Sequence, residues 1–121
     1  MRSYIYIDDA IEATIIAWRK TNSQFEAYNV GSEDWITVDE VADEVIKAME
    51  LSTVKKIYKP VLNGIGWPGD VKKIALKIDK IKKLGFKPEM NSREAIRTTA
   101  KKLLEEIGED LEAQTKPFGK T

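Results

Sequence analysis

The start of the chain has a pattern that predicts a buried strand followed by a helix. Residues 3–7 alternate Tyr and Ile after Ser3 and contain no internal polar residue, which is typical of a strand covered on both faces. Asp9 is followed three residues later by Glu12, the spacing of a helix capping box. We therefore expect a helix over residues 10–19. Apolar side chains lie nearly all round this helix, which predicts deep burial: Ile11, Ala13, Ile15, Ile16, Ala17 and Trp18.

The next segment predicts a second strand and an amphipathic helix. We expect the strand over residues 25–30, where Gly31 ends it. Thr37 and Glu40 form another capping box. After them, apolar residues recur at helical spacing on one side only: Val38, Val41, Ala42, Val45, Ile46 and Met49.

Extended segments and a short helix are expected in the middle of the chain. Pro60 places a short strand over residues 56–62 at a sheet edge, because proline cannot donate to a central ladder. Residues 71–78 fit helical and strand spacing alike. We interpret them as extended, because Asp79 is a suitable N-cap for a separate helix that ends at Gly85.

A long helix is predicted near the end of the chain. Asn91 and Glu94 mark its start, and Gly108 is expected to end it. One face of the helix is apolar: Ile96, Ala100, Leu103, Leu104 and Ile107. Residues 109–121 lose this periodicity and are expected to form a flexible tail. The order of all these elements predicts an α/β fold in a single compact unit over residues 1–108.

Composition removes several kinds of chemistry. The 121 residues are 42% hydrophobic and 8% aromatic, enough for the core of one domain. The chain has no Cys and no His, which excludes disulfides, thiolate or imidazole zinc sites, and Ser-His-Asp or Cys-His nucleophile systems. Asp8 and Asp9 are candidate metal ligands, but helix capping explains Asp9 more simply. We therefore expect no metal site.

Charge is balanced overall but not along the chain. Residues 1–54 hold eleven Asp/Glu against four Lys/Arg, and residues 55–121 hold nine against sixteen. A basic half can mark a nucleic-acid surface, but these lysines lack interleaved aromatics, so we favour solvated lysines and no nucleic-acid partner. No apolar stretch approaches the roughly 20 residues that span a bilayer, and Asp8 comes too early for a signal peptide. We expect no membrane partner and a cytoplasmic location.

The hexapeptide Gly64-Ile65-Gly66-Trp67-Pro68-Gly69 matches the G-x-G-x-x-G pattern of dinucleotide sites. Its context is poor, because Pro68 lies inside it and no helix is expected directly after it. We favour a tight glycine loop instead. None of the four tyrosines has a lysine four residues later, so a Tyr-x-x-x-Lys catalytic pair is absent. Composition and spacing alone indicate no function beyond that of a soluble α/β domain.

Five segments in order resemble the later part of the extended short-chain dehydrogenases/reductases. They are residues 2–10 (RSYIYIDDA), 28–31 (YNVG), the helix after Thr37, residues 66–71 (GWPGDV) and residues 84–88 (LGFKP). The most similar group is the nucleotide-sugar epimerases and dehydratases, the UDP-glucose 4-epimerase-like proteins. The resemblance implies partial Rossmann-edge strands and a helix over residues 1–36, and a small α/β substrate-binding domain over residues 37–108.

The resemblance also implies what this chain lacks. In the full-length family, an N-terminal Rossmann domain binds NAD and carries the Tyr-x-x-x-Lys pair. Neither the cofactor loop nor that pair is recognisable here, so we expect a fragment that binds no NAD alone and is inactive by itself. The alternative is a stand-alone module that binds sugar nucleotides or another protein without catalysis. The missing Rossmann domain and a second copy are the expected partners, the latter because uncovered strands and apolar faces favour a dimer or a strand-swapped assembly.

Three residues are implied in binding a UDP- or dTDP-sugar. Arg2 matches the arginine that approaches the substrate pyrophosphate, and Asp70 matches an acidic residue near the nucleotide ribose. Trp67 is a candidate for stacking on a base or sugar, and filling the loop against the core is an equal alternative. Relatives often carry a second phosphate-binding arginine in this loop, where this chain has Ile65 and Trp67. No catalytic residue is expected.

Overall fold

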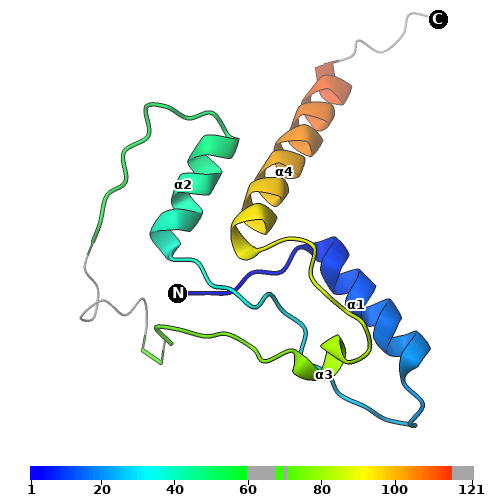
Figure 1. Ribbon diagram of the computed structural model, residues 1–121. Helices are drawn as coiled ribbons and strands as arrows, with labels where there is room; N and C mark the ends of the chain where they lie inside the picture. The colour runs from blue at the N-terminus through cyan, green and yellow to red at the C-terminus, as the bar shows by residue number, and fades with distance from the viewer. Residues whose placement is uncertain (60–67, 70, 116–121) are drawn as a thin grey trace, which may run out of the picture.

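The computed structural model describes residues 1–59, 68–69 and 71–115. The helices are α1 (Ile7–Lys20), α2 (Val38–Ala48), α3 (Asp79–Lys82) and α4 (Ser92–Thr115). Figure 1 shows α2 beside α4, with α1 and the short α3 on the other side of the molecule. Long extended segments connect these helices, so the described part of the chain is helical rather than α/β.

The expected α/β class, with its Rossmann-edge strands, is therefore wrong. Residues 3–7, 25–30 and 71–78 form no strand, and neither do the described residues of the segment 56–62. The described residues make a single isolated antiparallel bridge, between Arg2 and Ile36. A strand is stabilised by a ladder of hydrogen bonds to a neighbour, and these segments have no such ladder here. Their apolar residues contribute through side-chain packing instead.

The core lies between α1, α3 and the extended segments. Its buried centre consists of Ala13, Ile78, Ile81 and Phe86, all at most 2% exposed. Partly buried apolar side chains pack around this centre: Ile5, Ile16, Ala17, Tyr28 and Val30. Around this centre, segments far apart in sequence are held together mainly by side-chain packing, which explains why the strand-like patterns carry apolar residues without forming a sheet.

Deep burial of the first helix is a second prediction that is wrong. Ala13 faces the core and is fully buried, but the opposite side of α1 is open. Four large apolar residues lie on that side and are exposed: Ile7, Ile11, Ile15 and Trp18. An apolar pattern all round a helix shows that both faces favour burial, but it does not show that this chain covers both of them.

Two expected N-caps differ from the structure. Helix α1 begins at Ile7, and Tyr6 precedes it without a side-chain cap. Asp9 is instead buried in the first turn, where its carboxylate accepts hydrogen bonds from the backbone N–H groups of Glu89 (3.1 Å) and Met90 (3.2 Å). Asp79 is the first residue of α3 and provides no side-chain cap, since Ile78 occupies the cap position. Asp9 therefore fixes the segment before α4 rather than the start of its own helix.

The two expected capping boxes of the other helices are confirmed. The Thr37 hydroxyl accepts from the Glu40 backbone N–H, and the Glu40 carboxylate accepts from the Thr37 backbone N–H. At α4, the Asn91 side chain accepts from the Glu94 backbone N–H, and Glu94 accepts in return from Asn91 N–H, both at 2.9 Å. Reciprocal bonds of this kind satisfy the free N–H groups of a helix start.

Helix α4 continues past Gly108 to Thr115, so its expected end at Gly108 is wrong. Glycine ends a helix when it adopts a left-handed conformation. Among the described glycines, Gly69 (φ +88°) and Gly85 (φ +97°) do so, and Gly108 does not. The cost of a glycine inside a helix is about 1 kcal/mol, and a long helix tolerates it. Gly85 ends the turn after α3, as expected. The expected flexibility of residues 109–121 stays a prediction.

Two kinds of feature are absent from residues 1–59, 68–69 and 71–115. No helix there combines the length and the apolar character that crossing a membrane requires. No cluster of three or more acidic side chains there is arranged to hold a metal ion.

Candidate functional site

The N-terminal segment carries one of the three predicted binding residues, Arg2. The backbone of Arg2 pairs with that of Ile36, through N···O distances of 3.0 and 2.8 Å. Next to it, the Met1 carbonyl accepts from the Ile74 N–H at 3.4 Å, and the Met1 ammonium donates to the Lys72 carbonyl. Arg2 therefore lies between the turn before α2 and the segment that follows position 70. Trp67 and Asp70 lie outside the described residues.

An aromatic side chain and a lysine come together in the same region. The ammonium of Lys73 lies 3.7 Å from the centre of the Trp35 ring, a cation–π contact. Trp35 is 44% exposed, so part of its ring faces solvent. This pair was not predicted from the sequence, because the two residues are far apart along the chain and neither belongs to a motif. An exposed indole beside a cation is suited to an aromatic or anionic ligand.

A hollow of about 220 Å³ lies next to this segment. Its lining is mainly apolar and includes two hydroxyl groups: Ser3, Ile5, Val30, Gly31, Ser32, Ile74, Ala75 and Leu76. The Ser3 hydroxyl donates to the Ser32 carbonyl at 2.9 Å. Pockets for complete drug-sized ligands are usually about 300–1,000 Å³, so this hollow has room for one ring of a larger ligand.

A buried polar cluster fixes the same N-terminal segment to α4. Ser92 is fully buried; its hydroxyl accepts from the Tyr4 N–H at 2.9 Å and donates to Asp34 at 2.8 Å. The Asp34 carboxylate also accepts from the Ser92 backbone N–H, at 3.0 and 3.1 Å, and from the Ser32 hydroxyl. Burial raises the pKa of Asp34, but the hydrogen bonds from Ser32 and Ser92 outweigh it, so the pKa lies below its usual value.

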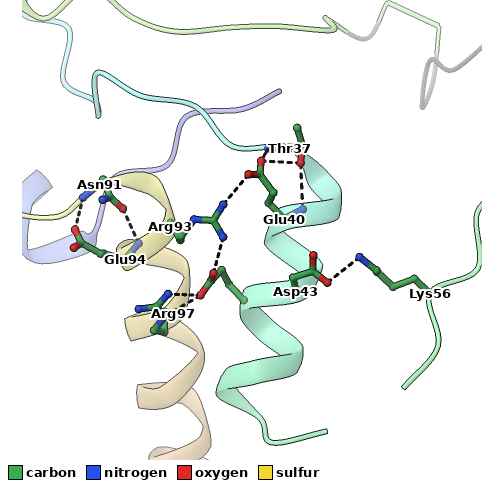
Figure 2. A network of polar contacts seen from close by, with 9 residues as sticks. Thr37, Glu40, Asp43, Lys56, Asn91, Arg93, Glu94 and Arg97 are labelled. Carbon is green, nitrogen blue, oxygen red and sulfur yellow. Dashed lines mark hydrogen bonds and ion pairs between the residues drawn. The ribbon is translucent and has the colours of Figure 1, made fainter. Parts of the chain in front are cut away.

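Helices α2 and α4 are joined by a charged network centred on Glu44. Figure 2 shows Arg93 and Arg97 of α4 on the side that faces α2, with Arg93 pointing toward Glu40. The Glu44 side chain is only 1% exposed. Arg93 donates to Glu44 and to Glu40, each at 2.7 Å, and Arg97 donates to the second Glu44 oxygen at 2.8 Å. Because both oxygens are occupied by arginines, the buried charge is compensated. This network holds the two helices in register.

We expect acid to weaken the chain through Glu44. The hydrogen bond from Arg93 lowers the pKa of Glu44 most, burial opposes it, and Arg97 lowers it further below the usual 4.5. The unfolded state therefore takes up the proton first as pH falls. The stabilisation is complete above the unfolded pKa and is lost as pH falls through the lower folded pKa. Urea unfolding between about pH 7 and about pH 3 measures this loss.

A matched pair of variants tests the assignment. Glu44→Gln should be less stable at neutral pH and should lose part of the dependence on pH between these limits. Glu105→Gln, on the exposed part of α4, should keep the full dependence. Equal slopes for Glu44→Gln and the unmodified chain would contradict the role of Glu44.

The described residues do not fit NAD. A dinucleotide site places a glycine turn between a strand and a helix, so that the pyrophosphate lies at the helix N-terminus. Gly69 has the positive φ of a tight turn, but the segment 71–77 after it is neither strand nor helix. The next helix, α3, has only four residues. Gly64 and Gly66 lie outside the described residues.

The chain is similar to a solved structure entitled "Crystal Structure of UDP-galactose 4-epimerase". The two share 35% sequence identity at a TM-score of 0.70, over 87% of this chain and 34% of the other. This chain thus spans about a third of the length of that protein. No protein-family model and no curated protein matches it. The combined similarity in fold and sequence indicates an epimerase-like relationship.

Proposed function

We propose that this chain is the nucleotide-sugar-binding part of an NAD-dependent epimerase or dehydratase of the UDP-galactose 4-epimerase type. The observation that supports this proposal most is the similarity of most of the chain to a third of that enzyme. The chain has no Tyr-x-x-x-Lys pair, and its described residues do not fit NAD. In this proposal the hydride chemistry belongs to another part of the enzyme, and this chain contributes substrate binding only.

The N-terminal region has groups that suit a nucleoside diphosphate sugar. Arg2 is half-buried, and its planar guanidinium suits two phosphate oxygens at once. Lys72 and Lys73 add positive charge in the segment beside it, and the exposed ring of Trp35 offers a surface for a base. The adjoining apolar hollow has room for one ring. Asp70 and Trp67, implied by the family resemblance, complete the proposed contacts.

Titration with UDP-galactose, followed by NMR, tests the proposal. We expect shifts near Arg2, Trp35 and Trp67, with smaller shifts for UDP and none for free galactose. Arg2→Ala should weaken binding about tenfold to a hundredfold, because a charge-assisted bond of about 1.5–3 kcal/mol is lost. Lys101→Ala, an exposed change on α4, is the matched control and should leave binding unchanged.

Two results would contradict the proposal in different ways. If neither UDP-galactose nor UDP-glucose at millimolar concentration changes the NMR chemical shifts, the chain does not bind nucleotide sugars and a protein-interaction module is favoured. Conversion of UDP-galactose by the isolated chain with added NAD would show that it carries its own catalytic site.

A further inference from the structure

The second half of α4 is a helix that the described part of the chain leaves uncovered. Residues 101–108 are all exposed, and Figure 1 shows this half of α4 extending past the end of α2. It nevertheless carries large apolar side chains on one face, exposed by 52, 36 and 56%: Leu103, Leu104 and Ile107. Apolar side chains gathered on one helix face indicate an interaction surface.

A groove continues this face toward the start of α4. The groove has a volume of about 310 Å³, lies between α4 and the end of α2, and is apolar apart from one threonine: its lining is Val45, Met49, Ile96, Thr99, Ala100, Leu103, Leu104 and Ile107. The groove and the exposed half of α4 together form one surface, which we call the α4 face. Its length along the helix suits a second helix as the partner.

The charges beside the α4 face are ordered in a way that fits a copy of itself. Residues 101–106 are Lys-Lys-Leu-Leu-Glu-Glu, so two lysines precede the central leucines and two glutamates follow them. When this segment is reversed and placed against itself, a glutamate lies opposite each lysine. The centre is occupied by leucines, so no charge faces its own counterpart.

The same order of charges gives little to α4 alone. Lys101 and Glu105, like Lys102 and Glu106, are four residues apart and are therefore neighbours on the helix surface. The orientation that stabilises a single helix better has the glutamate N-terminal to the lysine, and both pairs here have the reverse. The charge order is thus better matched to a partner helix than to α4 itself.

We propose that the α4 face binds the α4 face of a second copy in the antiparallel direction, with a two-fold axis between Leu103 and Leu104. Such an axis keeps the same flank of both helices on the same side and reverses its direction. The second half of each α4 then lies along the groove beside α2 of the other copy. A parallel pair would place lysines beside lysines and glutamates beside glutamates, so the charges select the antiparallel direction.

Each flank of the proposed pair has complementary charges. At about 100° per residue, Lys101 and Glu105 share one flank of α4, and Lys102 and Glu106 share another. Across the two-fold axis, Lys101 lies beside Glu105 of the partner subunit on the first flank. Lys102 lies beside Glu106 of the partner subunit on the second flank, and both contacts are offset by about one residue along the axis. Each contact occurs twice, so the pair has four ion pairs.

The surface predicts a dimer that depends on concentration and on salt. Exposed ion pairs contribute little free energy and are screened by salt, so burial of apolar side chains supplies most of the affinity. Association should therefore rise with protein concentration and weaken as salt increases. The proposal does not depend on nucleotide-sugar binding, so a chain that binds no ligand would leave it intact.

Sedimentation equilibrium from micromolar to millimolar concentration is the first test. The mass should rise from 13.7 kDa toward twice that value. Leu103→Glu places a charge beside the two-fold axis and should weaken association at least tenfold. Trp18→Glu is the matched control, because Trp18 is a large apolar residue on α1 that is 78% exposed, and it should associate normally. Circular dichroism verifies that each variant keeps its helices.

Two charge variants test the pairing even if Leu103→Glu does not fold. Lys101→Glu/Lys102→Glu and Glu105→Lys/Glu106→Lys each place like charges together, and each should associate at least tenfold more weakly than the unmodified chain at low salt. An equimolar mixture of the two variants should restore association, because each lysine again meets a glutamate. The second variant keeps the Lys102 ammonium over the Tyr6 ring, 5.4 Å from the ring centre, so loss of that contact does not account for its effect.

Cysteine substitutions measure the direction of the pair, because the chain has no cysteine of its own. Chains with Ala100→Cys and chains with Ile107→Cys, mixed and mildly oxidised, should give mainly the mixed disulfide, since positions 100 and 107 of the two copies lie level only in the antiparallel pair. Four results would each overturn the proposal: a monomer at millimolar concentration, an unchanged dimer in Leu103→Glu, a mixture of charge variants that stays monomeric, or mainly symmetric disulfides.

Discussion

Replacing Phe86 with alanine is expected to lower the free energy of unfolding by about 3–5 kcal/mol. Phe86 is 2% exposed and packs in the buried centre with Ala13, Ile78 and Ile81. Because no sheet ladder ties these segments together in the described part of the chain, side-chain packing around Phe86 holds α1 against α3. Small domains are stable by about 5–15 kcal/mol in total. The loss is therefore a large share, and urea unfolding followed by circular dichroism measures it.

A second phenylalanine provides the control. Phe25 is 85% exposed, so Phe25→Ala should change stability by less than about 0.5 kcal/mol. If Phe86→Ala does not fold, Phe86→Leu deletes fewer buried atoms and should cost about 1–2 kcal/mol. Equal stabilities for the Phe25 and Phe86 variants would show that the core does not lie where the structure places it.

The helices that the sequence predicted best are those with local signals. Thr37 with Glu40, and Asn91 with Glu94, are three residues apart, and each pair forms its capping box within one helical turn. Such bonds depend little on the rest of the molecule. Asp9 and Glu12 have the same spacing, but Asp9 bonds to the segment before α4 instead. A capping pattern alone does not tell a helix start from a long-range contact.

The strands were mispredicted because a strand depends on neighbours that the pattern does not contain. Residues 3–7 and 25–30 have the apolar character of strands, and residues such as Ile5, Tyr28 and Val30 do pack on the core. Pairing requires a second strand at a fixed register, and no such pairing forms within the described ranges. The apolar pattern thus identified which residues pack, but not the backbone geometry that they adopt.

Only part of the candidate site could be predicted from the sequence. Arg2 came from a family resemblance, whereas Trp35 and Lys73 meet only in the folded chain. The network around Glu44 did leave a signal: Glu40 with Glu44, and Arg93 with Arg97, are spaced four apart on two helices. Residues four apart lie on the same face of a helix, so the two glutamates form an acidic patch on one helix and the two arginines a complementary basic patch on the other. The apolar pattern of α2 by itself does not reveal the buried carboxylate of Glu44.

Replacing Asp34 with alanine is expected to cost about 2–4 kcal/mol of stability. Its carboxylate accepts from the backbone N–H and the hydroxyl of Ser92 and from the Ser32 hydroxyl. The Ser92 N–H lies at the start of α4 in a fully buried residue, so removing Asp34 takes away the acceptor of a buried donor. Leaving a buried donor unpaired costs more than the net gain from the bond. Urea unfolding measures the loss.

Two variants separate the hydrogen bonds of Asp34 from its charge and its position. Asp34→Asn keeps one acceptor oxygen for Ser92 and should lose only part of the stability. Glu33→Ala removes the neighbouring exposed carboxylate, which pairs with Lys82 at 2.8 Å. This change should alter stability little, because exposed ion pairs contribute little.

Hydrogen exchange adds a local readout. The backbone N–H groups in the first turn of α4 and the Tyr4 N–H should exchange faster in Asp34→Ala than in Glu33→Ala. Unchanged protection at both places would contradict a role for Asp34 in tying the N-terminal segment to α4.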